Sequence, residues 1–488
     1  MVLRRALALA VTIAAGAIPA ASGCARISGL DAWEIVDDAA PVADASVDQG
    51  AGDVSIDPAV DPSIDPGVGD TGSNESASEG GDSAQLDTGV EAEAGPDLDA
   101  SVDAASDAPA PECEAGAGEC QGLVPRTCDA TGHWKSGTAC QYVCQAGACT
   151  GVCVPGSKRC SGNLVQTCQP AGQWNTGVKC GDAKPACFEG ACVTPSCVGM
   201  ASKCGKGADQ SCCGASEVTG GTFKRSYDAV NATDQSYGAT VSTFVLDRYE
   251  VTVGRYRKFV EQYPASKPAA GSGRNPHNTS DAGWNASWPL PADQAELKSR
   301  LKCSAGYQTW TDASGGNEAK PINCLDWYMA YAFCIWDGGR LPTEAEWNYA
   351  AAGGGDASGH RVFPWSDPPN AWGIDPTYAV YECLADGNAS CSLADLPVVG
   401  SRSPKGDARW GQADMAGSLW EWTQDWFVEP YPVPCVDCAS LGTGTLRVMR
   451  GGGFDADAAN GSLLNVQRNY DAPGASFYSH GVRCARSP

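Results

Sequence analysis

Two copies of a six-cysteine pattern follow one another between residues 113 and 192. The first copy contains Cys113, Cys120, Cys128, Cys140, Cys144 and Cys149, and the second contains Cys153, Cys160, Cys168, Cys180, Cys187 and Cys192. The first four cysteines are spaced identically in both copies, and each copy has a tryptophan at the same place, Trp134 in GHW and Trp174 in GQW. This repeat predicts two copies of one small module, at 113–150 and 151–193.

The N-terminus has the composition of an export signal. Arg4 and Arg5 precede the apolar run of residues 6–18, which is too short to span a bilayer permanently. The small residues before Cys24 resemble the lipobox of bacterial lipoproteins, in which the cysteine is acylated and becomes the new N-terminus. We therefore expect residues 1–23 to be a lipoprotein signal peptide, and Cys24 to hold the exported protein at the outer membrane or cell surface. An ordinary secreted protein is the alternative.

About forty residues are too few to bury a sufficient core, so each module is expected to depend on cross-links. Export and an even number of cysteines favour three disulfides per module over a zinc site. The sequence leaves their connectivity open, because six cysteines can pair in many ways. A further cluster predicts a small two-disulfide module at 194–219, and it consists of Cys197, Cys204, Cys212 and Cys213.

The net charge of −25 comes mainly from one segment, because residues 31–112 contain 22 Asp and Glu and no Lys or Arg. Such a segment cannot bury enough apolar surface to offset chain ordering, so residues 24–112 are predicted to be a disordered acidic tether. An acidic tail that collects cations is the alternative. The rest of the chain lacks a basic stretch, which argues against a nucleic-acid partner.

From residue 220 onward the pattern predicts a mixture of strands and helices. A strand is expected at 239–251, where β-branched and aromatic residues dominate. Thr252, Asp326 and Thr343 are expected to cap three helices that begin after them, the last with a capping box to Glu346. These helices, together with short strands and long loops, indicate the α+β class.

Six words follow one another in this region: LDRYEVTVGRYRKFV, WDGGRLPTEAEWNYAAAGG, FPWS, ADMAGSLWEWTQDW, RVMRGGGF and HGVRCAR. Together they resemble the formylglycine-generating, sulfatase-modifying-factor family, whose fold is C-type-lectin-like. The resemblance covers 220–488 and implies this fold for that domain. It also implies that Cys334 pairs with Cys484, whereas sequence proximity pairs Cys303 with Cys324, Cys383 with Cys391 and Cys435 with Cys438.

In the family, two cysteines that follow RGGS bind the copper that performs the oxidation. Here the corresponding positions fall near Ala456 and Gly461, and Gly453 stands in the place of the serine. Because oxidation at copper needs thiolate ligands, we expect no copper. The expected role is a binding module for an unknown envelope protein, peptide or glycan.

Two routes would preserve an enzyme. Cys435 and Cys438 could supply thiolates, although a CxxC pair in an exported protein is usually a closed disulfide. An oxidoreductase with a cysteine-independent site is the other route, and a polar pocket of Asp455, Asp457 and Arg468 is the candidate for it.

The resemblance also implies a calcium site in the loop that leads into WEW. The family uses an Asn or Asp side chain, backbone carbonyls and a Glu, which correspond here to Asp414, Gly417, Leu419 and Glu421. Oxygen donors of this kind suit Ca²⁺. Calcium is therefore the expected cofactor, and a plain turn is the alternative.

Overall fold

The computed structural model describes residues 110–388 and 390–488. The expected signal peptide, the lipidation site Cys24 and all but the last residues of the expected tether lie outside the described residues. The described residues all belong to one unit of the chain. In the described part of the chain, no helix is long and apolar enough to cross a membrane.

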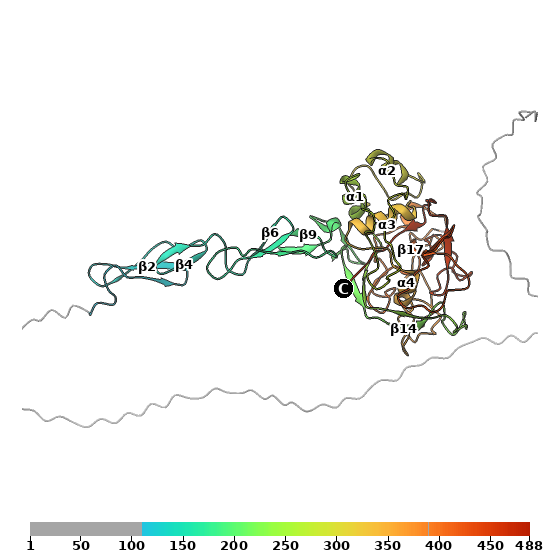
Figure 1. The fold of residues 1–488 in the computed structure, drawn as a ribbon, viewed down its shortest axis with the longest axis horizontal. Helices are drawn as coiled ribbons and strands as arrows, with labels where there is room; N and C mark the ends of the chain where they lie inside the picture. The colour runs from blue at the N-terminus through green and yellow to red at the C-terminus, as the bar shows by residue number, and fades with distance from the viewer. Residues whose placement is uncertain (1–109, 389) are drawn as a thin grey trace, which may run out of the picture. The chain divides into compact units, whose positions relative to one another are not determined.

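Each six-cysteine copy folds into a three-stranded antiparallel sheet followed by a two-stranded hairpin (Figure 1). The sheets consist of β1 (Gly118–Gln121), β2 (Val124–Cys128) and β3 (Trp134–Ser136) in the first copy, and of β6 (Lys158–Ser161), β7 (Leu164–Thr167) and β8 (Val178–Lys179) in the second. The hairpins are β4 (Val143–Gln145) with β5 (Ala148–Thr150), and β9 (Ala186–Phe188) with β10 (Ala191–Val193). The two copies therefore share one fold.

The disulfides follow one order in both copies: the first cysteine pairs with the third, the second with the fifth and the fourth with the sixth. The pairs are Cys113–Cys128, Cys120–Cys144 and Cys140–Cys149, then Cys153–Cys168, Cys160–Cys187 and Cys180–Cys192. The buried hydrophobic residues of the two copies are cysteines. Cross-links therefore take the place of a hydrophobic core in these modules.

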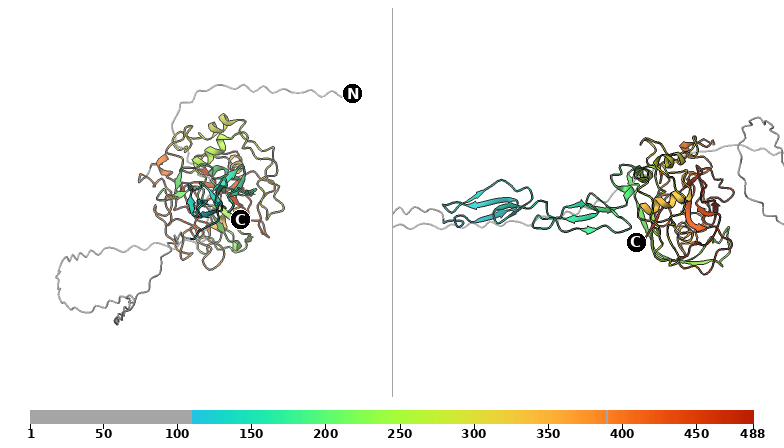
Figure 2. Two further views of the ribbon diagram at one scale, coloured as in Figure 1. Left: turned by 90° about the vertical axis from the view of Figure 1, so that its left-hand side faces the viewer. Right: turned by 45° about the horizontal axis from the view of Figure 1, so that its top comes forward.

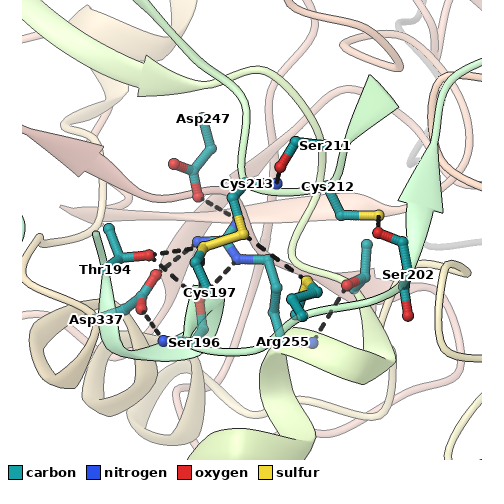
Figure 3. The surroundings of a disulfide bond; sticks show 12 residues. Thr194, Ser196, Cys197, Ser202, Ser211, Cys212, Cys213, Asp247, Arg255 and Asp337 are labelled. Carbon is teal, nitrogen blue, oxygen red and sulfur yellow. Dashed lines mark hydrogen bonds and ion pairs between the residues drawn. A yellow bond between two sulfur atoms is a disulfide. The ribbon is translucent and has the colours of Figure 1, made fainter. Parts of the chain in front are cut away.

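The four-cysteine module, with disulfides Cys197–Cys213 and Cys204–Cys212, is built into the domain that follows. It contains η1 (Pro195–Cys197), β11 (Lys203–Cys204) and β12 (Gln210–Ser211). The buried Ser196 donates its N–H to Asp337 Oδ1 at 2.8 Å, and its Oγ accepts from Arg255 Nε at 3.0 Å (Figure 3). The domain's first strand, β13 (Ala215–Val218), already pairs with β16, so the domain begins earlier than the expected residue 220.

The domain contains mixed sheets. One is antiparallel, with strand order β13, β16 (Phe244–Asp247), β21 (Ala485–Arg486), and a second is the hairpin of β14 (Gly221–Lys224) and β15 (Gly238–Val241). The third has the order β19 (Asn469–Asp471), β18 (Arg447–Arg450), β17 (Trp420–Trp426), β20 (His480–Gly481). In the third sheet β17 and β20 are parallel, whereas the other neighbours are antiparallel.

Few helices accompany these sheets: α1 (Val253–Glu261), α2 (Gln294–Arg300), α3 (Trp327–Trp336), α4 (Glu344–Ala351) and the short η2 (Leu393–Asp395). Helices α1, α2 and α3 lie on one side of the domain, and α4 contacts β15, β17 and β18 (Figure 1). Long loops connect these elements (Figure 2). Mixed sheets with few helices agree with the α+β class expected from the sequence.

The helix caps confirm the signals in the sequence. The side chains of Thr252, Asp326 and Thr343 accept hydrogen bonds from the first turns of α1, α3 and α4, and Thr343 and Glu346 form the predicted capping box. Helix α2 was not predicted, although Asp293 caps it by accepting from Glu296 N at 2.9 Å. Its signal, an Asp three residues before a Glu, was present in the sequence.

The prediction of a single strand at 239–251 is wrong, because the structure divides this segment into the two strands β15 and β16. The turn between them is held by Asp437, which accepts from Ser242 N at 2.6 Å and from Ser242 Oγ at 2.7 Å. As a result, β15 pairs with β14, whereas β16 pairs with β13 and β21. A side chain almost 200 residues away thus ends one strand and begins another.

The four cysteine pairs expected in the domain are all present, as Cys303–Cys324, Cys334–Cys484, Cys383–Cys391 and Cys435–Cys438. Cys334 and Cys484 are fully buried and join α3 to the end of the chain across 150 residues. They lie in the largest core cluster with Tyr256, Phe333 and Trp422. This disulfide therefore fastens the C-terminal segment to the helical side of the core.

Replacing Cys334 and Cys484 together by alanine should lower the free energy of unfolding by about 5 kcal/mol, because the disulfide closes a long loop in the unfolded chain. Replacing Cys383 and Cys391 together is the matched control, with an expected loss of about 2.5 kcal/mol for its short loop. Guanidinium unfolding of both double variants measures the difference. Equal losses would contradict the expectation.

Candidate functional site

The RVMRGG segment is fixed by buried ion pairs. Arg450, at the end of β18, is fully buried and donates from Nε to Glu344 Oε1 at 3.0 Å. Arg468 binds the same carboxylate through Nε at 2.7 Å and Nη2 at 2.9 Å. Burial alone would raise the pKa of Glu344, but Arg450 and Arg468 outweigh it and hold this pKa below its usual range. Glu344 thus stays charged at the start of α4.

The predicted polar pocket of Asp455, Asp457 and Arg468 does not form as one group. Arg468 is committed to Glu344, and it also donates to Val428 O at 3.0 Å. Asp457 lies in an exposed turn, where it accepts from Ala459 N at 2.8 Å. In the described part of the chain, no hydrogen bond or ion pair joins Arg468 to either aspartate. Arg468 thus forms its ion pair with the buried carboxylate of Glu344 and not with the loop of Asp455 and Asp457.

The positions that hold copper ligands in the resembling family contain no sulfur here. Ala456 packs against an apolar cluster that includes Phe363 and Leu463, and Gly461 lies in the turn that precedes Leu463. The loop at Cys383 is joined to this segment by backbone hydrogen bonds, from Cys383 N to Phe454 O at 2.8 Å and from Glu382 N to Ala456 O at 3.1 Å. All cysteines among residues 110–388 and 390–488 are paired in twelve disulfides, including Cys435–Cys438. The described residues therefore do not fit a copper centre.

The predicted calcium ligands do lie together, on the turn that enters β17. Asp414 and Ser418 adopt positive φ angles of 58° and 66°, and Gly417 has φ of 82°. A Cβ on Gly417 would lie 2.1 Å from Val380 O, so only glycine fits this position. The turn is held by Gly417 N, which donates to Gly451 O at 2.9 Å, and by Ser418 N, which donates to Val380 O at 2.9 Å.

Three buried carboxylates surround this turn. Glu421 accepts from Arg483 Nη2 at 2.8 Å and from Trp347 Nε1 at 2.7 Å. Glu250, which the sequence analysis did not identify, accepts from Ser418 Oγ at 2.8 Å and Leu419 N at 3.0 Å. Its only sequence signal is an acid between the buried apolar residues Tyr249 and Val251. Asp414 accepts from Gly400 N at 2.5 Å.

The three buried carboxylates of Glu250, Asp414 and Glu421 outnumber the cations that are paired with them. Burial, followed by repulsion from Asp414 and Glu421, raises the pKa of Glu250 well above its usual range. Burial likewise raises the pKa of Asp414 to about 6. Arg483 is the one cation that forms an ion pair with these carboxylates in the described part of the chain, and it binds Glu421. An additional cation would allow all three groups to remain ionised.

The donors of the turn suit a hard cation. Within the described ranges, no hydrogen bond is donated to the carbonyl oxygen of Gly417 or Leu419. Asp414 accepts a hydrogen bond through Oδ2 alone, which leaves Oδ1 available to a cation. Glu421 is less available as a metal ligand, because both of its carboxylate oxygens already accept hydrogen bonds. No three or more His, Cys, Asp or Glu side chains are grouped to hold a metal between 110 and 388 or between 390 and 488. A calcium ion at this turn would therefore rely on carbonyls as well as carboxylates.

A comparison with protein families assigns the class of this domain. The sequence model of the "Sulfatase-modifying factor enzyme 1-like domain" matches residues 201–488, which is more than half of the chain. The chain belongs to this family.

Curated relatives include enzymes of two kinds. Over 179 residues the chain is 35% identical to the formylglycine-generating enzyme of Streptomyces coelicolor, which covers 35% of this chain and 54% of that protein. It is 27% identical to the formylglycine-generating enzyme of Mus musculus, over 50% of this chain and 66% of that protein. It is also 27% identical to the hercynine oxygenase of Mycolicibacterium smegmatis, over 55% of this chain and 60% of that protein. The chain thus spans about half to two thirds of these relatives.

Among solved structures, the chain is similar to PvdO from Pseudomonas aeruginosa, with 20% identity and a TM-score of 0.38 over 56% of this chain and 94% of that one. It is also similar to Treponema denticola variable protein 1, with 18% identity and a TM-score of 0.36 over 56% of this chain and 95% of that one.

The carboxyl of Asp425 provides a pH test of the buried network. It accepts from Glu344 N at 2.7 Å and Ser440 N at 2.8 Å, and burial followed by repulsion from Glu344 raises its pKa to about 7. A raised pKa of the folded carboxyl stabilises the fold below the unfolded pKa of about 4, and this contribution is lost as pH rises toward 7. The loss should be roughly 4 kcal/mol.

The Asp425→Asn variant should therefore show a flatter dependence of its unfolding free energy on pH between 4 and 7 than the unaltered protein. Urea unfolding at several pH values measures this slope. Asp457→Asn, at an exposed turn, is the control and should keep the original slope. An unchanged slope in Asp425→Asn would show that the carboxyl of Asp425 does not cause the pH dependence of the unfolding free energy.

Proposed function

We propose that this protein is an exported, lipid-anchored binding protein in which a sulfatase-modifying-factor domain, of C-type-lectin-like form, serves as a recognition scaffold and not as a copper oxidase. One observation carries the proposal: the positions of the copper ligands are occupied by Ala456 and Gly461, and every described cysteine is in a disulfide. Oxidation of a substrate cysteine at copper requires thiolate ligands, which these residues cannot supply.

The family motifs have structural roles that do not depend on catalysis. Glu344, Glu346 and Glu421 each form buried ion pairs, with Arg450, Arg340 and Arg483 respectively. These residues preserve the frame whether or not a redox centre is present. Loops on such a frame could contact an envelope protein, a peptide or a glycan.

An oxidoreductase with a cysteine-independent site is the second candidate, and one observation favours it. Burial raises the pKa of Asp455, although a hydrogen bond from the Tyr478 hydroxyl lowers it in part. Burial also raises the pKa of Tyr478, to about 12. Perturbed acid and phenol groups beside each other are found at functional sites. Asp455 lies two residues after Gly453, close to where the family sequence approaches its reactive residues, and Tyr478 comes from the segment before β20.

The oxidase activity can be tested on the purified, oxidised protein. We expect no formylglycine in a cysteine-containing sulfatase peptide incubated with the protein, Cu(I) and oxygen, and no thiol titrated in residues 110–488. Mass spectrometry of the peptide detects the aldehyde, and an active formylglycine-generating enzyme serves as the positive control. Aldehyde formation would overturn the proposed function. If Asp455→Asn and Tyr478→Phe then abolished that activity, the cysteine-independent route would be supported.

We also propose that a calcium ion binds at the turn of Asp414, Gly417, Leu419 and Glu421. Ca²⁺ should raise the unfolding temperature of the chelated protein, because it neutralises the carboxylates of Glu250 and Asp414. Asp414→Ala should abolish this stabilisation, whereas Asp414→Asn keeps an oxygen donor and should weaken it. Differential scanning calorimetry measures both effects. Asp457→Ala is the matched control, and an equal loss of the effect in this variant would contradict the site.

The proposed lipid anchor depends on Cys24. Each buried methylene of an acyl chain contributes about 0.8 kcal/mol to membrane attachment, so several chains hold a protein firmly. We expect the protein to incorporate labelled palmitate and to sediment with the outer membrane, and the Cys24→Ser variant to do neither. Label in the Cys24→Ser variant would exclude this cysteine as the attachment site.

A further inference from the structure

Strand β13 leaves one edge of a sheet open. It is an edge strand of the three-stranded sheet β13, β16, β21. The edge at β21 is filled, because Ala485 N donates to Arg340 O and Arg340 N donates to Ala485 O, both at 2.9 Å. In the described part of the chain, no strand pairs with the outer edge of β13. An open edge of this kind can accept another chain as an additional strand.

The outer edge of β13 has unpaired backbone groups. Arg248 N donates to Gly214 O at 2.8 Å, so the alternation of an antiparallel ladder directs the backbone of Ser216 toward β16. The N–H and C=O groups of Ala215 and Glu217 therefore point to the open edge. They form no hydrogen bond with any part of the chain that the structure describes, and both residues are exposed. Two donors and two acceptors are thus available to an extended peptide.

A cavity of about 480 Å³ lies beside this edge. Ala215, Glu217 and Val245 line it from one face of the sheet, whereas the other face packs into the core. Ala183 and Lys184, from a loop of the second six-cysteine copy, line the facing wall. Ligand sites in proteins typically measure about 300 to 1,000 Å³, so the cavity is large enough for one or two side chains of a bound peptide.

The facing wall is joined to the domain by close contacts. A Cβ on Gly338 would lie 2.7 Å from Asp182 O, so the loop of the second copy packs on the turn that follows α3. Ser196, a few residues further along the chain, is hydrogen-bonded to Asp337 and Arg255 (Figure 3). Arg255 also lines the cavity, and buried carboxylates balance its charge. The cavity therefore has a fixed wall, and the arginine beside it is already neutralised.

The cavity favours an apolar side chain together with a cationic one. Val245, Ala215 and Ala183 supply its apolar surface. Glu217 is exposed, and it forms no ion pair with the residues that the structure describes, Lys184 on the facing wall included. A cationic side chain placed opposite Glu217 on an added strand would provide this carboxylate with a partner.

We propose that β13 binds an extended segment of a partner protein as an additional antiparallel strand, with a basic residue opposite Glu217 and an apolar residue opposite Ala215. Alternate side chains of a strand face the same way, so one residue separates these two in the peptide. Backbone hydrogen bonds supply affinity, and the cavity supplies selectivity. The acidic segment of this chain is a poor occupant, because its prolines lack an N–H and its aspartates would face Glu217.

The cavity is separate from the sites described above. None of the residues that line it belongs to the calcium turn or to the segment at Ala456. Strand addition at β13 is therefore possible whether the domain is an oxidase or a recognition module, and failure of either proposal leaves the other standing.

The capped peptide acetyl-Thr-Arg-Thr-Val-Thr-amide places Arg and Val on one side of an extended chain and can be titrated against the full chain. We expect saturable binding by calorimetry and slower amide hydrogen exchange at residues 214–218, because the N–H groups of Ala215 and Glu217 gain acceptors. The matched peptide with N-methyl groups on Arg and Val keeps the side chains but lacks these two donors. It should bind about tenfold more weakly.

Glu217→Gln removes the charge but keeps the size of the side chain, so the arginine peptide should bind this variant about threefold more weakly. A peptide with Gln in place of Arg should bind both proteins equally. Glu114→Gln, at an exposed position of the first copy outside the cavity, is the matched control and should keep the original affinity. Ala215→Pro removes one free N–H without touching the ladder to β16, and should weaken binding about fivefold.

Unchanged exchange at residues 214–218 of the unaltered protein with millimolar peptide would overturn the proposal, even if Ala215→Pro fails to fold. Equal binding of the N-methylated peptide would exclude strand addition. Equal affinities of Glu217→Gln and Glu114→Gln for the arginine peptide would overturn the place of its basic residue. A dimer of the unaltered protein that Ala215→Pro abolishes in sedimentation would assign the edge to a second copy and overturn the partner protein.

Discussion

The buried guanidinium of Arg483 joins the parts of the domain on which the rest of the structure depends. It is fully buried, binds Glu421 in β17, and donates to the carbonyl oxygens of Asp247, Arg248 and Ala413. One side chain near the end of the chain therefore connects β16, β17 and the turn between Asp414 and Leu419. Without it, three buried carboxylates would face one another without a cation, and removal of one partner from such a pair costs several kcal/mol.

This arrangement explains why the family motifs show the fold more clearly than the chemistry. RLPTEAEW supplies the capping box of α4 and the acids for Arg340 and Arg450, and WEW supplies Glu421 for Arg483. The same motif residues would be retained in an oxidase and in a protein without an oxidase centre. The residues after RGG form none of these ion pairs, so they can differ between members of the family without loss of the frame.

Several features could be predicted from the sequence because their causes are local. The capping residues Thr252, Asp326 and Thr343 lie three residues from their partners, and three of the domain disulfides join cysteines that are near in sequence. The features that were missed depend on distant contacts. Asp437 divides the strand at 239–251, Glu344 draws Arg468 away from Asp455 and Asp457, and Glu250 joins Asp414 only in the folded domain. Periodicity and spacing do not contain this information.

Disulfides have a different effect in a binding surface than in a redox centre. Cys383–Cys391 and Cys435–Cys438 close short segments, and Cys303–Cys324 closes the loop before α3. Loops that are ordered before a ligand arrives lose less conformational entropy on binding, so such cross-links increase affinity. A thiolate centre requires the opposite, since its cysteines must remain reduced and open to substrate. All cysteines among the described residues are held in twelve disulfides, so the cross-linked loops are ordered in advance, and this supports the recognition role that we propose.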